Sequence, residues 1–166
     1  MSEKMYCDPA EILEVTVQKG ITKASTPVWK LLCLGFLAGV FIAFASEGSN
    51  MAACGLFAKP ETYGLGKFVA GLIFPVGLIL VLLAGAELFT GNNLIIAAAL
   101  EKKVSLTAMF KNWIAVYIGN FIGSVFIAFL IVQSGLLSSG ASLLGGITIK
   151  IAYGKVSLSF VQAVFL

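Results

Sequence analysis

Hydrophobic residues in this chain gather into long runs, and polar residues mark the connections between them. The runs cover about residues 28–57, 67–100 and 110–137, and a fourth begins at 156 and reaches 166. About 20 apolar residues cross the roughly 30 Å hydrocarbon core of a bilayer, so each of the first three is long enough to span one. The pattern therefore predicts an all-α membrane protein with three full crossings.

The fourth run, residues 156–166, is too short to cross a bilayer as it stands. We therefore expect the chain to be the first half of a larger protein. The rest of the fourth span would either continue this chain or be supplied elsewhere.

Polar and small residues interrupt the second run at one depth. The interruption contains Gly85, Glu87, Thr90, Gly91, Asn92 and Asn93. Exposing a carboxylate and irregular backbone to lipid costs several kcal/mol. Non-helical backbone is tolerated at this depth only where protein buries it or where it lines a wet cavity. We interpret the stretch as a helix break that faces a permeation path, between an outer half at about 67–77 and an inner half at about 92–100. One long tilted helix with a single polar spot is the alternative.

Small residues recur along the first and third runs and predict close helix packing. Gly35 and Gly39 lie in the first run, and Gly119 and Gly123 form a small-xxx-small pair in the third. Asn112 and Asn120, also in the third run, are expected either to join helices or to serve a pore. In the first run Glu47 falls near the far membrane interface, where a solvated carboxylate is favoured over a pore role.

The first 27 residues precede the membrane and read as an amphipathic helix. Asp8 can cap it, Pro9 suits its first position and Glu11 completes a capping box. Such a helix lies along the membrane face or packs on a neighbouring subunit. We assign residues 1–27 to this segment, 28–138 to a three-helix repeat, 139–155 to an external Gly- and Ser-rich loop, and 156–166 to the start of a fourth span.

Composition agrees with a membrane protein and gives its orientation. Hydrophobic residues make up 59% of the chain, and the net charge of +3 comes from eleven basic residues, all lysine, against eight acids. Basic stripes with interleaved aromatic residues do not occur, so no nucleic-acid partner is expected. Lysines cluster before the first run and between the second and third, which places the amino terminus and the 101–111 connection in the cytoplasm.

Residues that could support metal binding or catalysis are few. The sequence has no histidine, and Cys7, Cys33 and Cys54 are widely spaced, so neither a zinc site nor a disulfide framework is expected. No Ser or Cys has a basic partner at a membrane break. We therefore expect no metal, no cofactor and no enzyme activity.

Several motifs of the chain resemble those of the formate/nitrite transporter family, in the same order. They are Leu-Leu-Ala-Gly-Ala-Glu-Leu-Phe-Thr-Gly at 82–91, Asn-Trp at 112–113, Tyr-x-Gly-Asn at 117–120, Gly-Ser at 123–124, Asp-Pro-Ala-Glu at 8–11, and Lys-Val-x-Leu-x-Phe-x-x-Ala at 155–163. The similarity covers essentially the whole chain. Within the family the chain looks most like the bacterial channels for hydrosulfide.

This resemblance implies an aquaporin-like fold of six spans, built from two inverted repeats, of which this chain covers the first repeat and the start of the fourth span. It also implies a homopentamer in the inner (plasma) membrane with one pore per subunit. An Ω-shaped loop in the second span would include Leu88, Phe89 and Thr90. Phe74, Leu78 and Leu88 match positions that narrow the pore, Thr90 matches the threonine at its centre, and Lys155 matches a vestibule lysine that attracts anions.

The function that we favour is a channel or secondary transporter for small monovalent anions: hydrosulfide, formate or nitrite. Half-helix amino ends, the Thr90 hydroxyl and the Lys155 ammonium would favour negative charge, and channel conduction and proton-linked transport both stay open. Lys155 has an alternative reading as an ordinary snorkelling lysine. An aquaporin-like channel for small neutral solutes or weak acids is the alternative function.

Glu87 has two readings. It could accept hydrogen bonds at the break, where Gly85, Gly91 and Asn92 would also be structural, or it could relay protons. We favour the structural role, because an anionic pore wall would repel the proposed substrate.

Overall fold

The computed structural model describes residues 6–165, so the first five residues of the predicted amino-terminal segment and Leu166 of the fourth run lie outside the described residues. The chain divides into two compact units. Unit 1 combines Met1–Val40 with Val81–Ser124, and unit 2 combines Phe41–Leu80 with Val125–Leu166. Each unit is described by itself.

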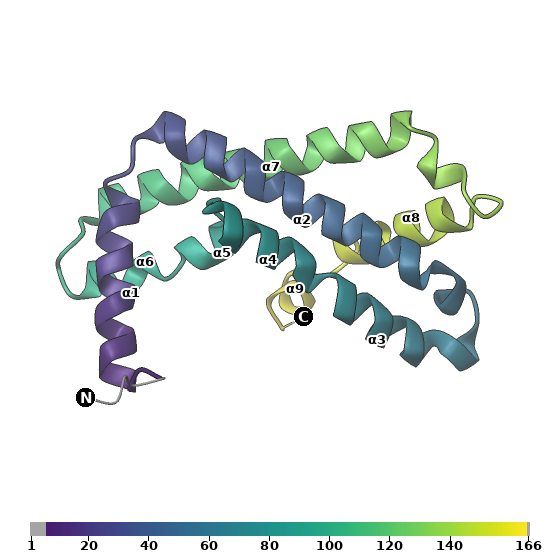
Figure 1. Ribbon diagram of the computed structural model, residues 1–166, viewed down its shortest axis with the longest axis horizontal. Coiled ribbons are helices and arrows are strands. Elements are labelled where there is room, and N and C mark those ends of the chain that lie inside the picture. Colours follow the sequence, from purple (N-terminus) through teal and green to yellow (C-terminus); the bar gives the residue numbers. More distant parts are fainter. Residues whose placement is uncertain (1–5, 166) are drawn as a thin grey trace. The chain divides into compact units, whose positions relative to one another are not determined.

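Helix α1, Pro9–Ala24, opens unit 1 with the predicted capping box. The Asp8 carboxylate accepts the backbone N–H groups of Ala10 and Glu11 at 3.1 and 3.0 Å, and the Glu11 carboxylate accepts the Asp8 N–H at 2.8 Å. The capping-box prediction is confirmed. Helix α1 lies beside α6, Ile95–Leu100, of the same chain (Figure 1), and a Cβ on Gly20 would lie 3.0 Å from that of Ala98. Its buried stripe therefore faces α6.

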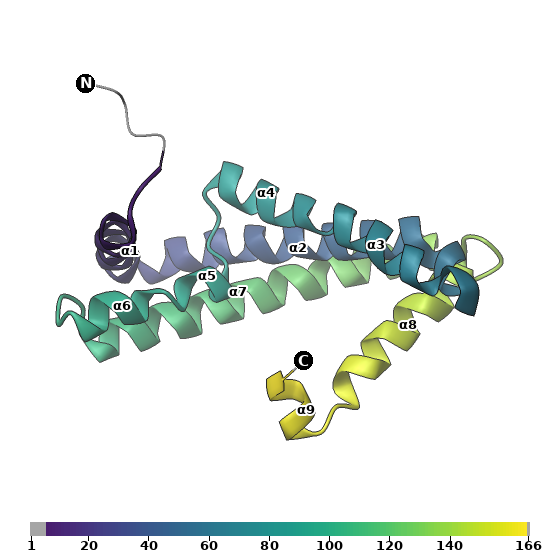
Figure 2. The same cartoon turned by 90° about the horizontal axis from the view of Figure 1, so that it is seen from below.

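Helices α2, Val28–Phe57, and α7, Leu106–Gln133, approach each other closely within unit 1. A Cβ on Gly39 would overlap the backbone of Asn120, and one on Gly123 would overlap the backbone of Phe36. The predicted packing role of the Gly119–Gly123 pair is confirmed, because a Cβ on Gly119 would lie 2.8 Å from the Leu32 carbonyl oxygen. Figure 2 shows the two helices side by side.

The second hydrophobic run forms four helices. After a 3₁₀ turn η1, Pro60–Thr62, come α3, Tyr63–Ile73, and α4, Pro75–Ala84, which together make one apolar helix. Then come α5, Phe89–Asn92, and α6. The helical part before the break thus reaches Ala84, beyond the expected 67–77. Pro75 is tolerated because Phe74 keeps helical angles and the first position of α4 needs no N–H partner.

Unit 2 contains a helix where the sequence predicted a loop. The range 139–155 is mostly occupied by α8, Leu143–Val156, which follows the 3₁₀ turn η2, Leu136–Ser138, and precedes α9, Phe160–Phe165. Leu144 and Ile147 bury their side chains, and Gly145 lies against the Leu137 carbonyl. Packing of these residues outweighs the helix-weakening Gly and Ser content that suggested a loop.

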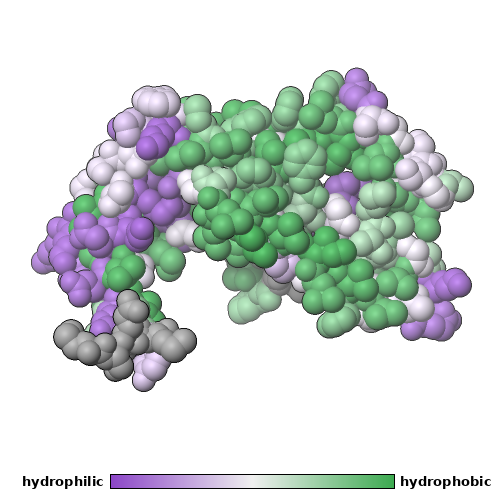
Figure 3. Space-filling model, in the orientation of Figure 1, coloured by the Kyte–Doolittle hydropathy of each residue, from purple (hydrophilic) through white to green (hydrophobic). Residues whose placement is uncertain are grey.

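Among the described residues, three helices are long and apolar enough to cross a membrane: Val28–Phe57, Pro60–Ala84 and Leu106–Gln133. All described regular elements are helical, as the all-α prediction requires. On the face shown in Figure 3, hydrophobic side chains cover α3 and α4, and hydrophilic ones gather over α1. Large apolar side chains such as Leu72 (62%) and Leu83 (81%) are exposed, which suits contact with lipid or other helices rather than water.

Candidate functional site

The predicted break lies in unit 1 and begins where helix α4 ends, at Gly85. Gly85 has φ +62°, in the left-handed region that favours glycine. Its N–H donates to the Leu82 carbonyl (3.3 Å), and the Ala86 N–H donates to the Val81 carbonyl (2.9 Å). These two bonds form a Schellman motif that satisfies the last carbonyls of α4. The chain then runs extended through Leu88 before α5 begins.

Asn120 of α7 holds the extended segment in place. Its amide nitrogen donates to the carbonyls of Gly35 and Glu87, each at 2.8 Å, and its amide oxygen accepts the Phe89 N–H at 2.9 Å. The Glu87 N–H in turn donates to the Leu34 carbonyl of α2 at 3.2 Å. The side chain of Asn120 thus takes the place of the backbone partners that a continuous helix would supply.

The Glu87 carboxylate is neutralised by a lysine from α1. Lys23 Nζ lies 2.6 Å from Glu87 Oε2 and also donates to Asn92 Oδ1 at 3.0 Å. Asn92 Nδ2 donates to the same carboxylate oxygen at 2.7 Å. The Glu87 side chain is only 12% exposed, so this cation and these hydrogen bonds compensate for its removal from water.

Two further side chains of α7 complete the network. Asn112 accepts a hydrogen bond from Asn92 Nδ2 (2.7 Å) and donates to the Lys23 carbonyl (2.9 Å). The Trp113 indole donates to the Asn92 carbonyl at 2.8 Å. Asn92 and Asn112 are fully buried, and every buried polar side-chain atom among the described residues has a partner. Asn112 and Asn120 therefore join helices, one of the two roles expected for them.

The sequence pattern does not link Lys23 or Trp113 to this arrangement. Lys23 belongs to the lysines that cluster before the first run, and Trp113 is of a type often found at membrane interfaces. Spacing alone offers no link between them, since 64 residues separate Lys23 from Glu87. The one available signal was chemical: a buried carboxylate calls for a cation.

The remaining residues predicted at the break differ in exposure. Thr90 and Gly91 are exposed, and Leu88 is half-buried. Phe89 packs edge-on against Tyr117 and Trp113, with ring centroids 5.5 and 6.3 Å apart, and contacts the core around Leu31. Gly85, Glu87, Leu88, Phe89, Thr90, Gly91 and Asn92 thus lie together in unit 1.

Phe74, Leu78 and Lys155 belong to unit 2. Phe74, between α3 and α4, is 45% exposed, and Leu78, within α4, is 46% exposed. Lys155 lies in the last turn of α8 and lines a cavity of about 430 Å³. The cavity is bounded by Phe57, Tyr63, Lys67, Ile147, Lys150, Ile151, Gly154, Lys155 and Leu158.

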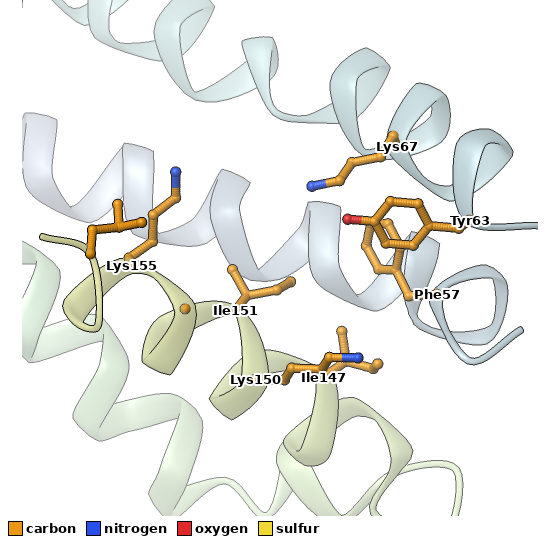
Figure 4. A pocket seen from close by; sticks show the side chains of 9 residues that line it. Phe57, Tyr63, Lys67, Ile147, Lys150, Ile151 and Lys155 are labelled. Atoms are coloured by element: carbon orange, nitrogen blue, oxygen red, sulfur yellow. The ribbon is translucent and has the colours of Figure 1, made fainter. Parts of the chain in front are cut away.

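This cavity is basic, with apolar walls. Figure 4 shows Lys67 and Lys155 reaching from α3 and α8 toward one space, with Ile151 between them. The Lys67 ammonium lies 5.5 Å from the Tyr63 ring centroid and 5.7 Å from that of Phe57. None of the lining residues is acidic, so the cavity favours anions.

The expectation of a solvated Glu47 is wrong. Its side chain is 7% exposed, on the part of α2 that belongs to unit 2. Thr148 of α8 and Asn50 face its carboxylate at 3.3 to 3.4 Å. Length along the helix suggested an interfacial position, but packing against α8 buries the residue.

Comparison with known proteins matches the chain to one family. The family model described as "Formate/nitrite transporter" matches residues 10–166. A "Probable formate transporter" from Methanothermobacter thermautotrophicus is 36% identical over 172 residues, covering 95% of this chain and 63% of the relative. "Formate channel BtFdhC" from Bacillus thuringiensis is 38% identical over 160 residues, covering 95% and 60%.

A third relative, "Formate channel FocA" from Escherichia coli, is 34% identical over 158 residues, covering 95% of this chain and 55% of the relative. The chain thus spans less than two thirds of the length of these relatives. The matched region includes the helix break with its polar network and the helix that carries Lys155. The chain is a multi-pass membrane protein and belongs to the formate/nitrite transporter family.

Proposed function

We propose that this chain is the pore-forming part of a membrane channel or secondary transporter for small monovalent anions. The observation that carries the proposal is the break in unit 1. Its polar groups are held by α1 and α7, and the Thr90 hydroxyl beside them is exposed. A break in an apolar helix, with its polar groups held in place, is a feature of substrate paths through membranes.

Glu87 serves a structural role in this proposal. Because Lys23 neutralises its carboxylate at 2.6 Å, the break carries no net negative charge from this pair to repel an anion. Gly85, Gly91 and Asn92 shape the same turn. Phe89 anchors the segment through its ring contacts, so that Leu88 and Thr90 are presented to the path.

Selectivity in the proposed path combines attraction with an apolar barrier. Lys155 and its neighbours in the basic cavity concentrate anions. Leu88, Phe74 and Leu78 act as apolar constrictions, which penalise a bare ion heavily. A weak acid passes such a constriction more easily in its neutral form. The path thus accepts the conjugate bases of small weak acids.

Formate is the first candidate substrate, since the names of three similar relatives include it. Hydrosulfide and nitrite are monovalent anions of comparable size and remain candidates. We further propose a six-span protein of two inverted repeats, assembled as a pentamer in the inner membrane. The amino terminus would face the cytoplasm, as the lysine distribution favours. We propose no enzyme activity.

Flux into liposomes that contain the purified protein tests the function. Formate, hydrosulfide, nitrite and water are offered separately, and protein-free liposomes provide the background. We expect anion flux well above background and water flux close to it. Water flux without anion flux would instead support an aquaporin-like channel, and no flux of any solute would reject the proposal.

A further inference from the structure

Glu47 carries a buried charge that the proposed function does not use. Its carboxylate is 7% exposed, and the facing groups are neutral: the Thr148 hydroxyl at 3.3 to 3.4 Å and the Asn50 amide at 3.4 Å. Among the described residues no lysine ammonium lies within salt-bridge distance of it. These long, neutral contacts compensate a buried carboxylate poorly.

The same carboxylate lies next to the basic cavity of unit 2. Thr148, which contacts Glu47, comes one residue after Ile147 and three before Ile151 on α8, and both of these isoleucines line the cavity. The carboxylate is therefore separated from the cavity by no more than the roughly 10–12 Å width of one helix. Through protein rather than water, charges at this distance still interact.

One turn of α2 makes polar contacts with both helices that carry the lysines of the cavity. Glu47 and Asn50 face α8, whereas Ser49, also buried, donates to the Ala70 carbonyl of α3 at 3.1 Å. Helices α3 and α8 supply the three lysines of the cavity: Lys67, Lys150 and Lys155. The turn that holds the negative charge thus also contacts the two helices that hold the positive charges.

We propose that Glu47 is the counter-charge of the basic cavity and sets how strongly the cavity attracts anions. The three lysines alone would hold an anion tightly and slow its release, and the buried carboxylate weakens that attraction. Its consequence for transport rests on the proposed function: Glu47 would keep anion residence at Lys155 short enough for passage. Glu47 contacts neither the anion nor the pore, so it would act on the anion only through the electrostatic potential in the cavity.

A cysteine in the cavity measures the local potential without any transport. In a background with Cys7, Cys33 and Cys54 replaced by serine, Ile151→Cys places a thiol on the cavity wall. The detergent-solubilised protein is then treated with two methanethiosulfonates of similar size, one with an anionic sulfonate and one with a cationic trimethylammonium group. The ratio of their reaction rates reports the sign and size of the potential.

Glu47→Gln should raise the anionic-to-cationic rate ratio about threefold to tenfold, as expected for one charge at about 10 Å with partial screening. Glu47→Asp should keep the ratio near that of the parent. An unchanged or lower ratio in Glu47→Gln would overturn the proposal. Because the readout is chemical labelling, the test of the Glu47 proposal does not depend on whether the protein transports anions.

Matched variants separate charge from shape. Thr148→Val removes the contact but no charge, and Glu14→Gln removes one exposed charge in α1; both should leave the ratio unchanged. A rise in either variant equal to that in Glu47→Gln would reject a specific counter-charge. If Glu47→Gln fails to elute as a single folded species, Asn50→Asp adds a second carboxylate at the same turn. It should lower the ratio, and an unchanged ratio there would equally overturn the proposal.

Discussion

Lys23 and Lys155 stand in nearly the same local setting but in different electrostatic surroundings. Each lies in the last turn of a helix whose C-cap residue is a serine, Ser25 for Lys23 and Ser157 for Lys155. The N–H of each serine donates a hydrogen bond to the carbonyl four residues earlier. An apolar helix follows shortly after each serine. Lys23 is paired with Glu87 and Asn92, whereas Lys155 has no acidic partner among the described residues and lines a cavity with two other lysines.

The comparison shows that local sequence does not decide what a lysine at a helix end does. Both lysines favour the carboxyl end of a helix through its dipole. Only Lys23 meets a carboxylate brought from 64 residues away, and its charge is used for stability. The charge of Lys155 stays available to a mobile anion. Five changes would break or sharpen this distinction.

Glu87→Ala should have the largest effect, on stability. It leaves Lys23 and Asn92 without their shared partner in a mostly buried network, and breaking such a pair costs roughly 3–5 kcal/mol. Unfolding in a graded series of SDS measures the loss. Lys155→Ala, the matched change, should leave the unfolding curve in place. A stable Glu87→Ala variant would contradict the structural role of the pair.

Replacing both members of the pair sharpens this result. Lys23→Met combined with Glu87→Leu removes both charges, so it should recover part of the stability that Glu87→Ala loses. A double variant that loses as much stability as the two single changes added together would show that the two charges act separately.

Thr90→Val should have the next largest effect, on anion flux. The change keeps side-chain shape but removes an exposed hydroxyl next to the network. A hydrogen bond to a charged group contributes roughly 1.5–3 kcal/mol, so flux should fall about tenfold or more while SDS unfolding is unchanged. Thr90→Ser, which retains a hydroxyl, serves as the control. Unchanged flux would place Thr90 outside the path.

Lys155→Gln should lower anion flux about fivefold at low ionic strength, equivalent to ~1 kcal/mol of lost attraction, with no loss of stability. Lys155→Arg should lose less. Lys150→Gln removes the same charge from the same cavity, and we expect it to lower flux by less than Lys155→Gln does. If both glutamine variants lose flux equally, and salt abolishes both losses, then Lys155 acts only as surface charge.

Lys67→Gln should have the smallest effect. The change removes contacts of the ammonium with the Tyr63 and Phe57 rings, each a type of contact worth about 0.5–1 kcal/mol at exposed sites. SDS unfolding should shift slightly, and Lys67→Arg should restore the parent curve. A shift as large as that of Glu87→Ala would mean that unit 2 also depends on a fixed cation.

Helix positions followed well from local patterns. The capping residues before α1 and the long apolar runs required only propensity and burial, which act over short distances. Gly85 and the polar stretch after it marked the break, because left-handed backbone and unpaired peptide groups both need special residues. The small-residue pair Gly119 and Gly123 likewise predicted close packing of α7 against another helix.

What the sequence left open depends on contacts between distant residues. The Gly- and Ser-rich stretch before Lys155 forms α8 because the side chains of Leu144 and Ile147 are buried in the folded chain. The position of Glu47 along α2 predicted an interfacial residue, but in the structure α8 packs against it and buries it. The Lys23–Glu87 pair was invisible for the same reason, since no periodicity connects two segments that meet only after folding.

The polar network around the break has a consequence for how the chain is made. Asn120 is synthesised 33 residues after Glu87, which at 5–20 residues per second corresponds to a delay of roughly 2 to 7 s. During that interval Lys23 is available to Glu87, but the amide that closes the turn is not. The break therefore reaches its final form only after Asn120 in the third span has been synthesised.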